Sequence, residues 1–370
     1  MRFLPDDEQT AFARSLDALL TASDTPAVVR SWAAGDPAAG RALWSRIADA
    51  GVFALAVPEA YEGLGPRPVE LAVAFVELGR HAVPGPLAET VAAAALLTGA
   101  GTGAGSGSGP GERFLPGLAA GRTIATVALP GAGPYVLDAD ASDMELTVTD
   151  TGAEAGTGTL TGSAGGELRV THAPAPPSTP VPTPTPAPPP PPPPRRSFDP
   201  ARHYSLPRAG GELLAAGPQV AAGAAEALRW ARLATAAQAL GVGLALLDRT
   251  VAYVGRRSQF GVPVGSFQVV RHRLADAKIA LEFARPLLFG AALSMDPADV
   301  AAAKVTACEA AYATARTALQ LHGAIGYTAE YDLSLWLTRA RALRSAWGGP
   351  GECRAAVLDA APVSGARRCS

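Results

Sequence analysis

Apolar residues recur at helical spacing through most of the first 120 residues. The spacing predicts helices over Ala11–Leu20, Arg41–Ala50 and Val69–Leu78. An apolar run over residues 51–57 lies between the last two and ends in proline and glycine. Residues 1–120 are therefore expected to form an N-terminal helical domain.

The same spacing returns after about residue 206, over longer stretches. Apolar side chains repeat every three or four positions in three series: Leu240, Leu244, Leu247, Val251 and Val254; Val270, Leu274, Ala277, Leu281, Ala284, Leu288 and Ala291; Val305, Cys308, Tyr312, Ala315, Leu319 and His322. A fourth, shorter pattern covers residues 333–346. Long helices that each carry one apolar seam predict an antiparallel four-helix bundle over residues 206–370.

The middle of the chain has a different pattern. Short β-prone runs at Thr123–Leu129, Tyr135–Leu137, Glu145–Val148 and Glu167–Val170 are separated by glycine, aspartate and proline. They predict a small antiparallel β domain within residues 121–205. Residues 150–196 end in an uninterrupted proline run, which favours polyproline II. We expect a stiff disordered insertion there; the alternative is a recognition site for a proline-binding module. The fold class is mainly α with a small, reduced β domain.

Composition narrows the possible partners. The chain has 370 residues, of which 48% are apolar and 6% aromatic, so its core must be built from alanine, leucine and valine. The net charge of −2 gives no electrostatic reason to expect nucleic acid or a membrane surface. The three cysteines show no metal-ligand or disulfide spacing, and no metal is expected. No secretory signal or membrane-spanning apolar run is recognised, so the expected location is the cytoplasm.

Two short motifs interrupt the bundle pattern. One runs from Arg257 to Gln268 and includes Phe260, Gly261 and Pro263. The other, residues 320–331, is rich in glycine and aromatic residues. Taken alone, each is consistent with a turn between helices. Together, across a matching bundle, they resemble the flavin-binding signature of the acyl-CoA dehydrogenase family. Similarity to that family extends over most of the chain except residues 150–196.

The resemblance implies FAD as cofactor and an oligomer as the working form. In the family, the loop matching Arg257, Phe260 and Gln268 contacts FAD held by a neighbouring subunit. The turn matching Gln320, Gly323 and Ala324 lies against the adenosine and pyrophosphate end; Ala324 stands where the family has a second glycine. A shared flavin site implies a homo-oligomer, or a heteromer with a second acyl-CoA dehydrogenase-like subunit.

The resemblance also implies α,β-dehydrogenation of an acyl-CoA thioester, for which a buried glutamate removes the α-proton. Trp347 occupies the common position of that glutamate, and about Ala231 the alternative one. Glu226, the nearest carboxylate to Ala231, lies on a different helical face. Glu352, near Trp347, resembles an exposed helix start. The catalytic residue is therefore unknown, and His322, on an apolar seam, is interpreted as structural.

The middle domain also departs from the pattern of the family. Families of this kind offer serine and threonine donors to the flavin ring, whereas this chain has only Ala128–Gly133 at the comparable place. The chain resembles the shorter, degenerate partners in paired acyl-CoA dehydrogenases, including those that act on steroid side chains. The expected function is an FAD-dependent acyl-CoA dehydrogenase subunit. The alternatives are a non-catalytic scaffold or regulatory subunit and a same-fold flavoenzyme such as an oxidase.

Overall fold

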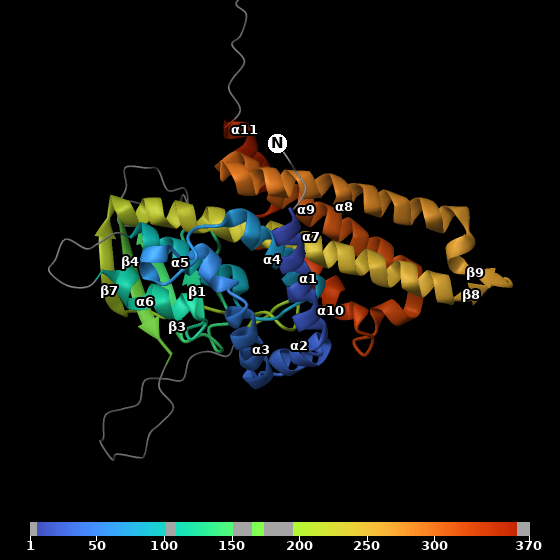
Figure 1. The fold of residues 1–370 in the computed structure, drawn as a ribbon, viewed down its shortest axis with the longest axis horizontal. Coiled ribbons are helices and arrows are strands. Elements are labelled where there is room, and N and C mark those ends of the chain that lie inside the picture. The colour runs from blue at the N-terminus through green and yellow to red at the C-terminus, as the bar shows by residue number, and fades with distance from the viewer. Residues whose placement is uncertain (1–5, 101–108, 151–164, 174–194, 361–370) are drawn as a thin grey trace, which may run out of the picture. The chain divides into compact units, whose positions relative to one another are not determined.

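The computed structural model of the chain describes residues 6–100, 109–150, 165–173 and 195–360 (Figure 1). These residues form two compact units. One joins residues 1–22, 68–82 and 232–370, and the other joins residues 23–67 and 83–231. The long helix α7 contributes its first part to the second unit and the rest to the first.

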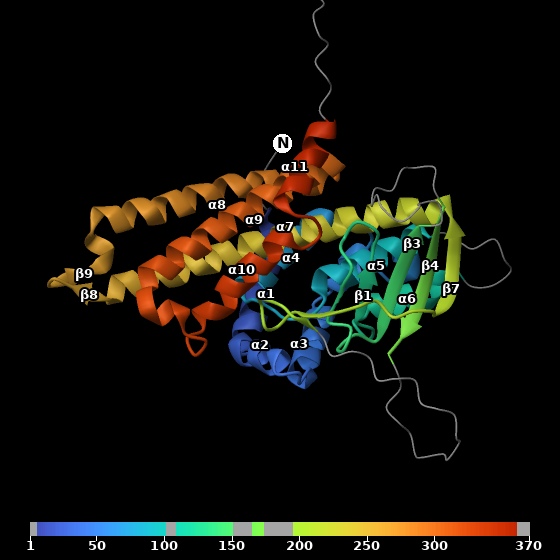
Figure 2. The same ribbon diagram turned by 180° about the vertical axis from the view of Figure 1, so that it is seen from behind.

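The first unit is helical and contains the expected bundle. Its helices are α1 (Asp7–Thr21), α4 (Pro68–Arg80), α7 (Pro218–Arg256), α8 (Gln268–Ser294), α9 (Pro297–His322), α10 (Leu333–Ser345) and α11 (Pro350–Ala360). Figures 1 and 2 both show α7, α8 and α9 running side by side. Helices α10 and α11 contact α9, so the four-helix pattern predicted from the sequence is confirmed, with α11 added.

Small residues set how closely these helices approach. A Cβ atom at Gly79 of α4 would lie 2.2 Å from the carbonyl oxygen of Gln238 in α7. One at Gly241 of α7 would lie 1.9 Å from the carbonyl oxygen of Val76. Neither position has room for a methyl group, so the backbones of α4 and α7 are in direct contact. This close packing is how a core with few aromatic side chains reaches normal density.

The second unit combines helices with two small sheets. Its helices are α2 (Thr25–Ala33), α3 (Ala38–Asp49), α5 (Leu87–Gly99) and α6 (Pro110–Ala119), with 3₁₀ turns η1 (Phe53–Ala56) and η2 (Glu59–Tyr61). The larger sheet has the order β1 (Ala125–Ala128), β3 (Met144–Asp150), β4 (Gly166–His172), β7 (Glu212–Gly217). The smaller has the order β2 (Val136–Leu137), β6 (His203–Ser205), β5 (Arg195–Arg196). Helix α5 packs against β1.

One sheet pairing differs from the antiparallel prediction. Strands β3, β4 and β7 pair antiparallel, but β1 pairs parallel to β3, with Ala125 opposite Met144. The chain leaves β1, adds β2 to the smaller sheet and returns before β3 begins, so β1 and β3 run in the same direction. The proline-rich insertion predicted after residue 150 lies largely outside the described residues.

Helix α7 corrects the expectation that no apolar run is long enough for a membrane span. It contains an 18-residue window with the length and hydropathy of one. However, 94% of that window is buried inside the structure. The apolar surface of α7 therefore packs against protein, as in the central helix of a core.

Candidate flavin-contact site

The first motif forms the connection between α7 and α8. Strands β8 (Ser258–Gln259) and β9 (Val262–Pro263) make a tight hairpin, and the 3₁₀ turn η3 (Val264–Ser266) leads into α8. Phe260 and Gly261 sit at its tip with φ of 54° and 78°. The Phe260 side chain is 92% exposed. A non-glycine residue with a left-handed backbone is strained, and an aromatic ring exposed to solvent is unfavourable. The conformation of Phe260 is therefore costly in the isolated chain.

Arg257 links the two motifs. Its guanidinium donates hydrogen bonds to the Tyr253 hydroxyl and to the carbonyl oxygen of His322, the latter at 3.3 Å. Tyr253 stacks on the His322 ring with centroids 4.1 Å apart. The sequence-predicted residues Arg257 and Gly323 therefore come together where α7 and α9 end. Tyr253 was not predicted, although its spacing of four from Arg257 places both on one helical face.

Gln320 and its neighbours form the second half of the site. Gln320 accepts a hydrogen bond from Arg273 of α8, another residue not predicted from the sequence. The 3₁₀ turn η4 (Gly323–Tyr327) follows α9. Gly323 has φ of 67°, and a Cβ atom there would meet nothing within 4 Å. Ala324 and Gln268 are both exposed. The turn thus exposes backbone groups near the cationic side chain of Arg273, with open space beside Gly323.

His322 lies beneath this surface. It is fully buried, and its Nδ1 lies 2.8 Å from the carbonyl oxygen of Ala318. Burial lowers the pKa of the imidazole, and the nearby Arg257 lowers it further. The Nε2 of His322 is buried and has no hydrogen-bond partner among the described residues. The structural interpretation of His322 therefore stays a prediction.

These residues fit one part of FAD. Exposed arginines, a glycine turn and an exposed aromatic ring suit a pyrophosphate and an adenosine. The loop after β1 does not fit the flavin ring equally well. Residues 128–133 include no serine or threonine, and Pro130 has no backbone N–H to donate.

The position at which the resemblance places the base, Trp347, lies in a closed turn between α10 and α11. Trp347 is 7% exposed and has φ of 57°. Its carbonyl oxygen accepts a hydrogen bond from Arg232 Nε at 3.0 Å. Fully buried Lys304 of α9 donates to the carbonyl oxygens of Arg344 and Gly348. The arrangement fixes the backbone, and the indole of Trp347 itself is no proton acceptor.

The other carboxylates near the expected base positions have structural partners. Glu226 accepts a hydrogen bond from Trp230 Nε1 at 2.8 Å and pairs with Arg229 at 3.0 Å. Glu352 accepts from the backbone N–H of Gly349 at 2.6 Å, at the start of α11. Each carboxylate is hydrogen-bonded within its own helix or at its helix start, as a structural side chain would be.

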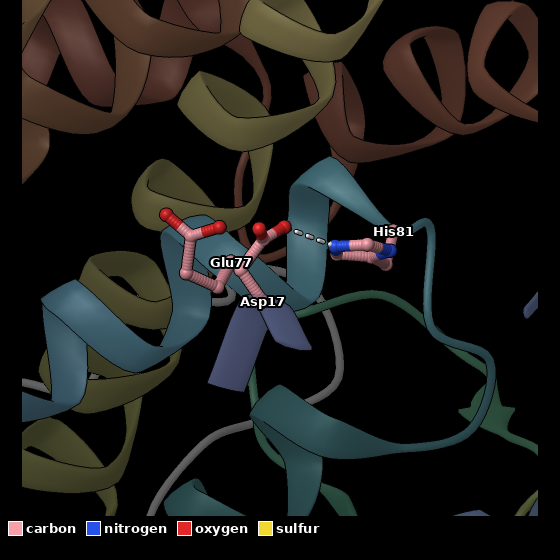
Figure 3. Close-up of side chains that lie close together, drawn as sticks. All are labelled: Asp17, Glu77 and His81. Atoms are coloured by element: carbon pink, nitrogen blue, oxygen red, sulfur yellow. Dashed lines mark hydrogen bonds and ion pairs between the residues drawn. The ribbon is translucent and has the colours of Figure 1, made fainter. Parts of the chain in front are cut away.

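One carboxylate in the first unit does have the pKa of a general base. Burial raises the pKa of Glu77 to about 7, against the opposing effect of Arg80 and with a smaller contribution from Asp17. Figure 3 shows Glu77 of α4 and His81, which directly follows α4, on either side of Asp17 from α1. Asp17 Oδ1 lies 2.8 Å from His81 Nε2, and Arg80 lies 3.6 Å from Glu77. The group is an ion-pair cluster between two helices, apart from both motifs in sequence.

Two family profiles cover most of the chain. Residues 6–122 match the acyl-CoA dehydrogenase N-terminal domain, and residues 221–361 match the acyl-CoA dehydrogenase C-terminal domain. The chain belongs to the acyl-CoA dehydrogenase family.

Similarity to individual proteins extends over most of the chain. The chain is 30% identical over 339 residues to acyl-CoA dehydrogenase IpdE2 of Mycobacterium tuberculosis, covering 91% of this chain and 92% of IpdE2. A Tcur3481-Tcur3483 steroid ACAD matches with TM-score 0.73 and 25% identity, covering 95% and 97% of the two chains. The ChsE4-ChsE5 complex of Mycobacterium tuberculosis matches with TM-score 0.76 and 24% identity, covering 98% and 100%. The expected fold is confirmed.

Proposed function

We propose that this chain is one subunit of an FAD-dependent acyl-CoA dehydrogenase heteromer, in which it completes the flavin site of a second acyl-CoA dehydrogenase-like subunit. The observation that carries the proposal is the contrast within the first unit. Residues of the flavin motifs are gathered and exposed, whereas the base position is a buried tryptophan. The name of the Tcur3481-Tcur3483 relative joins two components, which supports a paired assembly.

Within that assembly this chain's own residues bind and position. Arg257 and Arg273 supply fixed donors for the pyrophosphate, and the Gly323 turn lets backbone approach it closely. Phe260 and Gln268 extend the contact surface. FAD held by these residues would supply the hydride acceptor for the β-carbon of an acyl-CoA. The α-proton is taken by a carboxylate of the second subunit, because neither Trp347 nor Ala231 has a basic group.

The substrate is proposed to be an acyl-CoA thioester. A steroid-derived acyl group is favoured by the relative described as a steroid ACAD. The second candidate function is a non-catalytic scaffold or regulatory subunit. It is favoured by the Ala128–Gly133 loop, which lacks hydroxyl donors for a flavin ring.

A co-purification experiment separates these functions. The tag-free chain is purified alone and together with a second acyl-CoA dehydrogenase-like subunit from the same source. Flavin absorbance is recorded, and bleaching by acyl-CoA is followed without oxygen. The proposal expects flavin and bleaching only in the mixture. Bleaching by the chain alone would contradict the heteromer, and a flavin-free but stable complex would favour the scaffold.

A further inference from the structure

A second group of titratable side chains lies in the second unit, away from the flavin motifs in sequence. Asp138 and Asp140 follow strand β2, and His203 begins strand β6. The two strands pair antiparallel, with Leu137 opposite Tyr204. One oxygen from each aspartate and one imidazole nitrogen all lie within 4.8 Å of one another. The sequence could not show this set as a ligand motif, because Asp140 and His203 are 63 positions apart.

Of these three side chains, Asp138 is the one whose hydrogen bonding is incomplete. Its side chain is fully buried, and the residue has φ of 50°. Oδ1 accepts a hydrogen bond from the backbone N–H of His203 at 2.8 Å. Oδ2 has no hydrogen-bond partner among the residues that the structure describes. A buried carboxylate oxygen without a partner is destabilising, and a proton or a cation would remove the penalty.

His203 is oriented as a metal ligand would be. Its Nδ1 lies 2.9 Å from Asp140 Oδ2. The ring also forms a hydrogen bond with the backbone of Ala33. Since Nδ1 faces the aspartate, the backbone oxygen is left to the second ring nitrogen. Metal-binding histidines commonly donate that second N–H to a backbone carbonyl, which fixes the tautomer and the ring plane.

A cavity of about 390 Å³ gives access to the group. Its walls include Asp140 and His203, together with Arg195, Ser197 and Gly35. Asp138 is not part of the wall and lies fully buried behind it. An ion held by the three side chains would thus have protein on one side and open space on the other.

Two arginines lie close to this group. Arg202 is buried and lies 3.7 Å from Glu89, so its charge is shared with another carboxylate. Arg195 lies at the cavity wall. Neither forms a hydrogen bond with Asp138 Oδ2, which stays without a partner among the described residues.

We propose that Asp138, Asp140 and His203 bind one divalent transition-metal ion, such as Zn²⁺, with a free coordination position that opens on the cavity. One imidazole and two carboxylates suit zinc, whose tetrahedral ligands lie about 3.3 Å apart. The pair of His203 and Asp140 is already near that spacing, so small side-chain movements suffice.

The Asp17–Glu77–His81 cluster provides a matched comparison (Figure 3). It offers the same ligand types within the same distance. Its Asp17 side chain is 54% exposed, and Glu77 already pairs with Arg80. A cation there would compete with an arginine and with water. We therefore expect binding at the His203 group and not at this cluster.

The test uses the tag-free full-length protein, freed of metals by chelation. Zn²⁺ is titrated against a chromophoric chelator, and Co²⁺ is added separately to record its visible absorption. We expect one equivalent to bind and the thermal midpoint to rise. His203→Gln removes a proposed ligand and should weaken Zn²⁺ binding by at least about tenfold, the lower limit for loss of a residue that only supports a ligand, and Asp140→Asn should weaken it similarly. His81→Gln, the control, should leave binding unchanged.

Three outcomes overturn the proposal. They are no Zn²⁺ bound at millimolar concentration, binding that survives His203→Gln, and binding that is lost in His81→Gln. Circular dichroism of each variant without metal shows whether it folds. Asp138→Asn serves as a second variant: it keeps the shape of the side chain but removes its charge, so it should fold and lose metal.

Discussion

The end of the bundle and the α10–α11 turn belong to the same compact unit, yet they are built in opposite ways. At the bundle end, Phe260 and Gln268 are exposed, and the guanidinium of Arg257 bridges two helix ends. At the turn, Trp347 is buried, and its backbone is held by Arg232. The first region has binding groups open to a partner. The second is closed by structural contacts. Under the proposed function, cofactor binding by this chain would therefore not require it to abstract a proton.

Replacing Trp347 by glutamate tests the closed turn most severely. The change removes a buried indole and places a carboxylate in its cavity, so unfolding should become easier by about 4 kcal/mol. Urea denaturation measures the loss, and Trp347→Phe should cost less than half as much. We expect no acyl-CoA oxidation by the variant chain alone. A gain of turnover would show that the turn does face a substrate.

Lys304→Met removes the α9 side chain that is hydrogen-bonded to the same turn. Methionine keeps most of the side-chain volume but leaves the carbonyl oxygens of Arg344 and Gly348 without their buried donor. We expect a loss of about 3 kcal/mol in the free energy of unfolding. The exposed Lys278 is the control, and Lys278→Met should change stability by less than about 0.5 kcal/mol. Equal effects would contradict the structural role of Lys304.

The raised pKa of Glu77 should make the free energy of unfolding depend on pH. Its pKa is about 7 in the folded chain and 4.5 ordinarily. Between these values the folded state retains a proton that the unfolded state has released, so this group makes stability fall as pH rises through the window. Glu77→Gln should remove this effect and stabilise the chain by about 2 kcal/mol more at pH 8 than at pH 5. Parallel pH profiles for wild type and variant would refute the raised pKa.

Arg257→Gln tests the open region and should leave the fold intact. Because the guanidinium is exposed, we expect the unfolding free energy to change by less than about 1 kcal/mol. In the assembled heteromer, however, the dissociation constant for FAD should rise about tenfold, as expected for loss of one charge-assisted hydrogen bond. Flavin release during gel filtration measures it. Arg316→Gln, on the exposed face of α9, is the control and should retain flavin.

The sequence predicted the bundle because its helices are long and carry regular apolar seams. It also identified the residues of both motifs, since glycine, proline and aromatic residues interrupt those seams. It did not predict α2 or α5. Helix α5 is apolar and buried on nearly every side, so it shows no helical stripe. The parallel pairing of β1 with β3 depends on a crossover that no local pattern encodes.

The site was harder to predict than the fold for a related reason. Arg273 pairs with Gln320 across 47 positions, and Lys304 reaches Gly348 across 44. Contacts of this kind depend on how helices align, which one sequence does not specify. Tyr253 was within reach of sequence reasoning, because it lies one helical turn before Arg257.

The exposed ring of Phe260 has a consequence for how the cell must produce this protein. Ile325 and Tyr327 of the second motif are also exposed, so both motifs carry aromatic or aliphatic side chains in solvent. In the heteromer proposed above, the second subunit would cover them. We therefore expect the two subunits to be synthesised together in matched amounts, and a surplus of this one to precipitate or be degraded first.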